Sequence, residues 1–124
     1  MRQIKFRGKS IETGEWIYGG LSIFNGEATI FDENCVANSA YEVEINSICQ
    51  FIGLNDKNGL EIYEGDILRI KCLGWEYAVV KFHFGVFGFF VTENERLQAN
   101  VPQYWENSEI IGNIHDNPEL AYRS

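Results

Sequence analysis

The dipeptide Asn25-Gly26 constrains the fold of this chain more than any other local feature. Both residues tolerate positive φ, which the two central positions of a type I′ hairpin turn require. The turn fixes a register that pairs four residues of one strand with four of the next: Phe24 with Glu27, Ile23 with Ala28, Ser22 with Thr29, and Leu21 with Ile30. Because side chains alternate across a strand, this register puts Leu21, Ile23, Ala28 and Ile30 on a single face. The pattern predicts a β-hairpin.

The same period-2 alternation recurs along the chain and predicts further short strands. They fall near residues 3–7, 15–24, 41–45, 47–54, 61–64, 67–72, 77–84 and 108–114. Turn-forming residues separate the strands, and those with an architectural role are Asn25, Gly26, Gly53, Asn58, Gly59, Gly65 and Asp66. Residues 92–99 are instead predicted as a short helix, since Thr92 and Glu95 match a capping box and Pro102 lies just beyond.

These spacings predict a mainly β fold, a small barrel or sandwich of about eight short antiparallel strands with at most one or two short helices. A chain of 124 residues suits one domain. Within it we expect an N-terminal hairpin layer over roughly residues 3–31 and a barrel-like part over roughly residues 41–116.

Charge and cysteine content narrow the classes of function. The net charge of −8 opposes general binding to nucleic acids and anionic membranes. Cys35, Cys49 and Cys72 are an odd, widely spaced set without a CxxC motif, which predicts reduced thiols. Basic residues follow Met1 at once, with no apolar signal segment, so we expect a cytoplasmic protein.

No catalytic, cofactor-binding or metal-binding motif is apparent. Residues 56–64 resemble a calcium loop in composition but lack its order of ligands, and a β-turn explains them better. His83 and His115 are interpreted as surface or strand-end residues. A hydrolase using Asp66 with His83 or His115 stays the least favoured alternative, and we predict no cofactor, no metal and no enzyme activity.

A candidate interaction surface combines basic and aromatic residues: Lys5, Arg7, Lys9, Trp75 and Tyr77. The three basic residues alternate along the first strand, where they either contact an acidic partner or protect an edge strand from pairing, and we favour the protective role. With Arg69, Lys71 and Lys81 they would form the contact surface of a nucleic-acid-associated small barrel, a second alternative. Trp75, Tyr104 and Trp105 are either core residues or an exposed ligand-binding set.

Three segments carry a resemblance to a known family. They are residues 4–19, with Lys5-Phe6-Arg7-Gly8 and Gly14-Glu15-Trp16; residues 50–67, with Gly53-Leu54-Asn55-Asp56 and Tyr63-Glu64-Gly65-Asp66; and residues 109–120, with Gly112-Asn113-Ile114-His115. In these segments the chain resembles the YopX-like proteins of bacterial phages and prophages. The resemblance implies a mostly β accessory protein of a phage or prophage, and it brings no catalytic residue with it.

The leading functional hypothesis is therefore a non-catalytic module that self-associates or binds a host or phage protein. Its motivation is the combination of a small β architecture, an acidic surface and no recognisable reaction chemistry. Homo-oligomers and protein partners are expected, membrane binding is not, and nucleic-acid binding is disfavoured by the charge.

Overall fold

The computed structural model describes residues 4–33, 39–70, 75–83, 86–91, 97–99 and 107–121. The predicted mainly β fold is confirmed, and the strands form a six-stranded and a five-stranded antiparallel sheet. The chain divides into two compact units, Met1–Phe51 and Ile52–Ser124. The boundary falls inside a strand, later than the predicted end of the hairpin layer, because β4 and the start of β5 also belong to the first unit.

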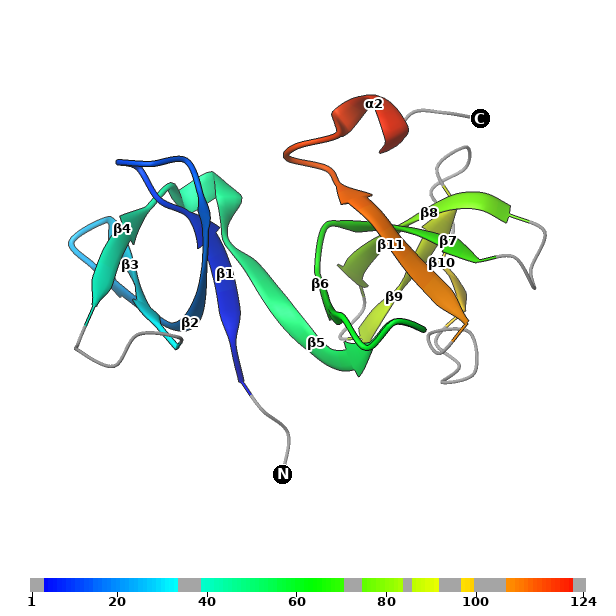
Figure 1. The fold of residues 1–124 in the computed structure, drawn as a ribbon, viewed down its shortest axis with the longest axis horizontal. Coiled ribbons are helices and arrows are strands. Elements are labelled where there is room, and N and C mark those ends of the chain that lie inside the picture. Colours follow the sequence, from blue (N-terminus) through cyan, green and yellow to red (C-terminus); the bar gives the residue numbers. More distant parts are fainter. Residues whose placement is uncertain are drawn as a thin grey trace. The chain divides into compact units, whose positions relative to one another are not determined.

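The first unit is built from strands that follow one another in the sheet. Its elements are β1 (Phe6–Lys9), β2 (Trp16–Phe24), β3 (Glu27–Asp32), β4 (Ala40–Val43), the 3-10 turn η1 (Ile45–Ser47) and the start of β5 (Cys49–Asn55). The six-stranded sheet has the order β4-β3-β2-β1-β5-β6. In Figure 1, β3 lies between β2 and β4.

The predicted hairpin is confirmed in turn and in register. Strands β2 and β3 pair Phe24 with Glu27 and continue to Leu21 opposite Ile30. Asn25 and Gly26 have φ of 51° and 78°, as the type I′ turn requires. One face of these strands forms the core of the unit, made by Ile17, Ala28, Ile30 and Val43. Period-2 alternation thus fixes both the pairing and the buried face.

The first unit also curls, because the end of β1 reaches the far side of β4. Ser10 and Val43 form an isolated antiparallel bridge. On either side of it, the Ile11 N–H donates to the Glu42 carbonyl at 3.0 Å and the Glu44 N–H donates to the Lys9 carbonyl at 2.9 Å. The curl explains how a single sheet encloses a core without a second layer.

The second unit holds the five-stranded sheet, in the order β10-β9-β8-β7-β11. Its elements are the end of β5, β6 (Glu61–Tyr63), β7 (Asp66–Ile70), β8 (Trp75–His83), β9 (Val86–Val91), β10 (Leu97–Ala99), β11 (Ser108–Asn113) and the helix α2 (Pro118–Ala121). Among the described residues, each of the two sheets ends in edge strands, so neither closes into the barrel that the turn spacing suggested. Ile62, Ile67, Leu68 and Val80 are fully buried in this unit.

One local prediction near the C-terminus is wrong. Leu97–Ala99 is strand β10, paired with β9 through Leu97–Phe90 and Ala99–Phe89, rather than the end of a helix. Pairing with a neighbouring strand outweighs the local capping signal; Thr92 and Glu95 lie outside the described residues. Pro118 begins α2, in keeping with the preference of proline for the first helical turn.

Helices in the described part of the chain are short, and none is long and apolar enough to cross a membrane.

Candidate protein-interaction face

The basic stripe on β1 is not the exposed surface that the sequence suggested. β1 lies between β2 and β5, so it is a central strand and cannot protect a sheet edge. Lys5 and Arg7 are both only 5% exposed. Phe6, between them, packs against the core, as the alternation predicts. Lys5 and Arg7 lie on the face opposite to Phe6, and that face is buried as well. The edge-strand interpretation is therefore wrong, and only Lys9 keeps partial exposure.

Aromatic rings explain how the cationic side chains of β1 are accommodated. The Arg7 guanidinium lies 4.6 Å and the Lys9 ammonium 5.3 Å from the ring centroid of Trp16. Lys9 and Trp16 are direct partners in the β1–β2 ladder, which brings them together. Lys5 lies 5.6 Å from the ring of Phe51. Cation–π attraction stabilises a charge at the face of a ring, so the stripe has a structural role in the first unit.

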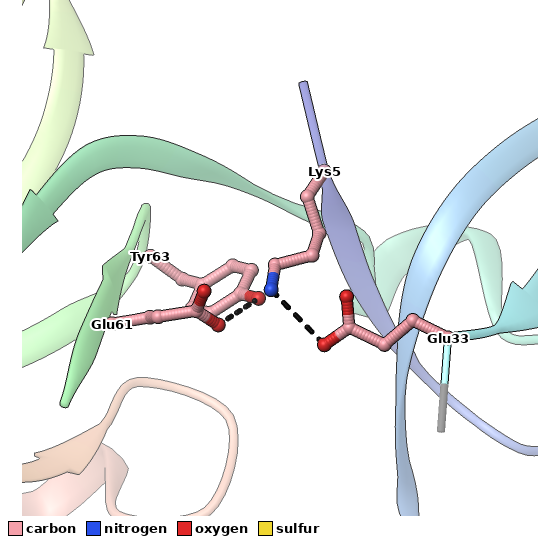
Figure 2. Close-up of polar contacts among 4 residues, drawn as sticks. All are labelled: Lys5, Glu33, Glu61 and Tyr63. Carbon is pink, nitrogen blue, oxygen red and sulfur yellow. Dashed lines mark hydrogen bonds and ion pairs between the residues drawn. The ribbon is translucent and has the colours of Figure 1, made fainter. Parts of the chain in front are cut away.

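Lys5 also makes an ion pair within the first unit. Its ammonium lies 3.0 Å from the Glu33 carboxylate, just after β3 (Figure 2). Figure 2 also shows the Tyr63 hydroxyl donating to Glu61 at 3.2 Å, a contact made within the second unit. Both contacts hold polar groups of largely buried side chains, Lys5 and Tyr63.

The other residues proposed for a nucleic-acid or ligand surface lie in the second unit of the chain or outside the described residues. Arg69 on β7 and Lys81 on β8 belong to the second unit. Trp75 and Tyr77 begin β8, but their side chains lie outside the described part of the structure. Lys71, Tyr104 and Trp105 lie outside it altogether. Whether Trp75, Tyr104 and Trp105 are core residues or an exposed ligand-binding set therefore stays as the sequence left it, with both alternatives open.

The turn residues have the backbone roles that their types suggest. Positive φ is found at Gly53, Gly59 and Gly65, with values of 90°, 80° and 89°. Asp66 stabilises the turn before β7, since its carboxylate accepts a 2.7 Å hydrogen bond from the Tyr63 N–H. Asn58 donates its backbone N–H to the Asp56 carboxylate at 2.9 Å. These contacts are the kind that an architectural role for this part of the sequence requires.

Asp56 is the residue of this region that sequence reasoning missed. It is 5% exposed, and one of its carboxylate oxygens accepts the N–H groups of Asn58 and Leu60, each at 2.9 Å. The other oxygen accepts the N–H of Ile110, on the edge strand β11, at 3.0 Å. The carboxylate therefore joins a turn to a strand 54 residues away. Only the dense cluster of turn residues around it was visible in the sequence.

The groups considered for catalysis and metal binding have structural contacts. The Asp66 carboxylate is 1% exposed and bonded to backbone. The backbone N–H of His115 donates to the Asn113 side chain at 2.9 Å within a tight turn, and the side chain of His83 lies outside the described residues. Within the described ranges, no group of three or more His, Cys, Asp or Glu side chains is arranged to hold a metal ion.

An exposed apolar and acidic face lies on the outside of the β2–β3–β4 sheet. Period-2 geometry places it opposite the core, and its exposed members are Gly20, Ser22, Phe24, Glu27, Phe31, Ala40 and Glu42. We call these residues the outer hairpin face. Phe24 is 75% and Phe31 52% exposed. Large aromatic side chains left in water beside carboxylates are typical of a binding surface rather than of a reaction centre.

Comparison with known proteins places the chain by family and fold. The family model described as YopX protein matches residues 5–121. Among solved structures, the crystal structure of protein EF1440 from Enterococcus faecalis is similar, with a TM-score of 0.62 and 23% sequence identity over 98% of this chain and 99% of that chain. At this identity the likeness concerns the fold, and fold alone does not specify function. No curated protein matches the chain.

Proposed function

The chain belongs to the YopX family, and from this starting point we propose that it is a non-catalytic module that binds another protein through the outer hairpin face. The proposed setting is the cytoplasm of a bacterium during phage or prophage growth, as the resemblance noted in the sequence implies. The exposure of Phe24 and Phe31 on one face of a small sheet carries the proposal.

The energetic argument rests on the two phenylalanines. Burial of a large apolar side chain stabilises an association by roughly 1.5–3 kcal/mol relative to exposure. Phe24 and Phe31 have 75% and 52% of their surface in water, so most of that free energy is still to be gained. Gly20, opposite Phe31 in the ladder, has open space where a Cβ would stand, so a partner's side chain can enter there.

The two alternatives have weaker support. Nucleic-acid binding needs exposed cations, whereas Lys5 and Arg7 are buried and the net charge is −8. Hydrolysis needs an accessible carboxylate beside a base, whereas Asp66 is buried and bonded to the Tyr63 backbone. A protein partner fits both the aromatic residues and the carboxylates of the outer hairpin face.

The experiment compares capture by the wild-type chain and by the double variant Phe24→Ser, Phe31→Ser. Immobilised protein is exposed to a bacterial lysate, and retained proteins are identified by mass spectrometry. We expect a partner that the wild type retains and the variant loses. The matched control is Leu60→Ser, which removes a 54% exposed apolar side chain from the second unit and should retain the partner.

Light scattering on the purified chain separates a second copy from a different partner. A mass above the monomer that falls with the double variant would assign the outer hairpin face to self-association. Equal capture by the wild type and the double variant, with a monomeric mass for both, would contradict the proposed use of this face.

A further inference from the structure

A pocket beside the edge of β4 shares Ala40 and Glu42 with the outer hairpin face and adds lining residues that the proposed function does not use. It has a volume of about 180 Å³ and is lined by Ser10, Ile11, Glu12, Ala40, Tyr41 and Glu42. Small-molecule pockets usually span about 300–1,000 Å³, so this one suits a single side chain better than a free ligand. All of its lining belongs to the first unit.

The pocket lies where the pairing of β4 with the end of β1 stops. The Glu42 carbonyl accepts the Ile11 N–H, so the backbone groups of Glu42 point to this edge of β4. Period-2 alternation directs those of Ala40 to the same edge. Residues 11–13 then turn away, closed by the Gly14 N–H donating to the Ser10 carbonyl at 2.8 Å. A short stretch of β4 therefore presents backbone groups next to the pocket.

The side chains around this stretch favour a cation with an apolar stem. Glu12 and Glu42 are exposed carboxylates, Ile11 is 55% exposed, and none of the lining residues is basic. The nearest cation in sequence, Lys9, lies against the ring of Trp16. A lysine or arginine side chain combines a hydrocarbon stem with a charged end and so complements both kinds of lining group.

We propose that β4 accepts an extended, basic segment of a partner protein, which pairs with the backbone at Ala40, beyond the point where Ile11 pairs with Glu42, and places a lysine or arginine side chain in this pocket. Addition of a strand to an open sheet edge is a common mode of peptide recognition, in which backbone bonds supply affinity and side-chain pockets supply specificity. The inference rests on the proposed protein-binding function and specifies the charge and conformation of the partner.

The test measures fluorescence anisotropy of a labelled peptide of about eight residues in which lysine alternates with valine. We expect the wild-type chain to bind it and to ignore two related peptides, one with glutamate for lysine and one with N-methyl groups on the pairing edge. The double variant Glu12→Lys, Glu42→Lys should weaken binding by at least about tenfold, because it reverses both charges at the pocket.

The matched control is Glu15→Lys, Glu119→Lys, two exposed glutamates that neither line the pocket nor belong to the outer hairpin face. Each double variant changes the net charge by the same amount, from −8 to −4, since each substitution adds two charges. Circular dichroism verifies that both variants fold. Equal weakening by the two variants would overturn the proposal by showing non-specific attraction, as would full binding of the N-methylated peptide.

Two further outcomes would also overturn it. One is a dimer mass in light scattering that Glu42→Lys abolishes, which would assign the edge to a second copy. The other is the absence of wild-type binding to the basic peptide. If capture still depends on Phe24 and Phe31 in that case, the proposed function stands and only the basic segment is excluded.

Discussion

Trp16 holds two cationic side chains of the neighbouring strand, Arg7 at 4.6 Å and Lys9 at 5.3 Å from its ring. An Arg side chain that is 5% exposed would be costly without such compensation, because burial disfavours charge. The aromatic ring supplies attraction to the cation and apolar contact to its stem. Trp16 thus helps to accommodate the charges of Arg7 and Lys9 on a strand at the centre of a sheet.

We expect Trp16→Ala to lower the free energy of unfolding by about 2 kcal/mol or more, since it removes apolar contact and the cation–π partner together. Trp16→Phe, which keeps a weaker ring, should cost about half as much. Urea unfolding measures both. Phe24→Ala removes an aromatic side chain that is 75% exposed and serves as the control, with little change expected. A Trp16→Ala variant as stable as the control would contradict the structural role.

Asp56 leads to a second prediction at this scale. Asp56→Ala leaves three backbone N–H groups without their acceptor and should lower the free energy of unfolding by about 3 kcal/mol. Asp56→Asn keeps one acceptor oxygen, so its free energy of unfolding should lie between those of the wild type and of Asp56→Ala. Lys57→Ala is the neighbouring control. It breaks only a 3.4 Å ion pair with Glu109, in which the Lys57 side chain is 40% and the Glu109 side chain 32% exposed. The free energy of unfolding should therefore change by less than about 0.5 kcal/mol.

If Asp56→Ala and Lys57→Ala unfold at the same urea concentration, the Asp56 carboxylate does not hold the turn to β11.

The sequence could reveal Asp56 as a turn residue but not as a link to Ile110, because the partner lies 54 residues away and no local pattern encodes it. The edge-strand interpretation of the basic stripe was wrong for a similar reason. Lysine and arginine are usually exposed, and the sequence alone does not show that Trp16 pairs with Lys9. The exposure of Phe24 could have been predicted from the sequence, since its position beside the Asn25-Gly26 turn places it at the tip of the hairpin.

At the scale of elements, β2 contains two adjacent glycines, Gly19 and Gly20, that differ in the space available for a side chain. A Cβ on Gly19 would collide with the carbonyl oxygen of Phe31, across the ladder on β3, and Gly19 has a φ of 156°. A Cβ on Gly20 would meet open space. The close approach at Gly19 lets the Glu33 N–H reach the Tyr18 carbonyl at 2.9 Å and so extends the pairing of the hairpin.

We therefore expect Gly19→Ala to lower the free energy of unfolding by about 3 kcal/mol or more, because strand pairing must shift. Gly20→Ala should be neutral or stabilising by up to about 1 kcal/mol, because alanine loses less entropy than glycine on folding. Thermal unfolding followed by circular dichroism compares them. Similar melting temperatures for the two variants would show that β2 and β3 separate easily at Gly19.

Elements were predictable where two local signals agreed. The β2–β3 hairpin has both a turn dipeptide and matched alternation, and its register is as expected. Residues 92–99 had a capping signal without a long helical period, and the described part, Leu97–Ala99, pairs with β9 instead. Sheet closure depends on the order of all strands, which turn spacing does not determine, so the open sheets could not be foreseen.

At the scale of the whole molecule, the chain forms two compact units whose boundary lies within the continuous strand β5. The first unit has its own core around Ile30, and the second contains the fully buried Leu68. Cys49 is buried in the first unit and forms no disulfide, so its thiol reports when that unit opens. A boundary inside a strand carries no linker composition, so the sequence does not mark it.

We predict that the two units open separately. In a background with Cys35→Ser and Cys72→Ser, Ile30→Ala should speed labelling of Cys49 by a thiol reagent about 30-fold or more, the equivalent of about 2 kcal/mol for a core truncation. Leu68→Ala should destabilise the second unit by a similar amount and leave the labelling rate nearly unchanged. Equal acceleration by both substitutions would show that the units unfold as one.

The contacts that Asp56 and its neighbour make with β11 also bear on how this protein survives at high concentration. β11 ends the five-stranded sheet, yet two of its backbone groups are occupied, the Ser108 carbonyl by the Lys57 N–H at 2.9 Å and the Ile110 N–H by Asp56. Backbone groups that are already hydrogen-bonded cannot pair with another strand, so this edge is a poorer template for the growth of a fibril. A strand-rich chain can thus accumulate in a crowded cell without recruiting further copies along this margin.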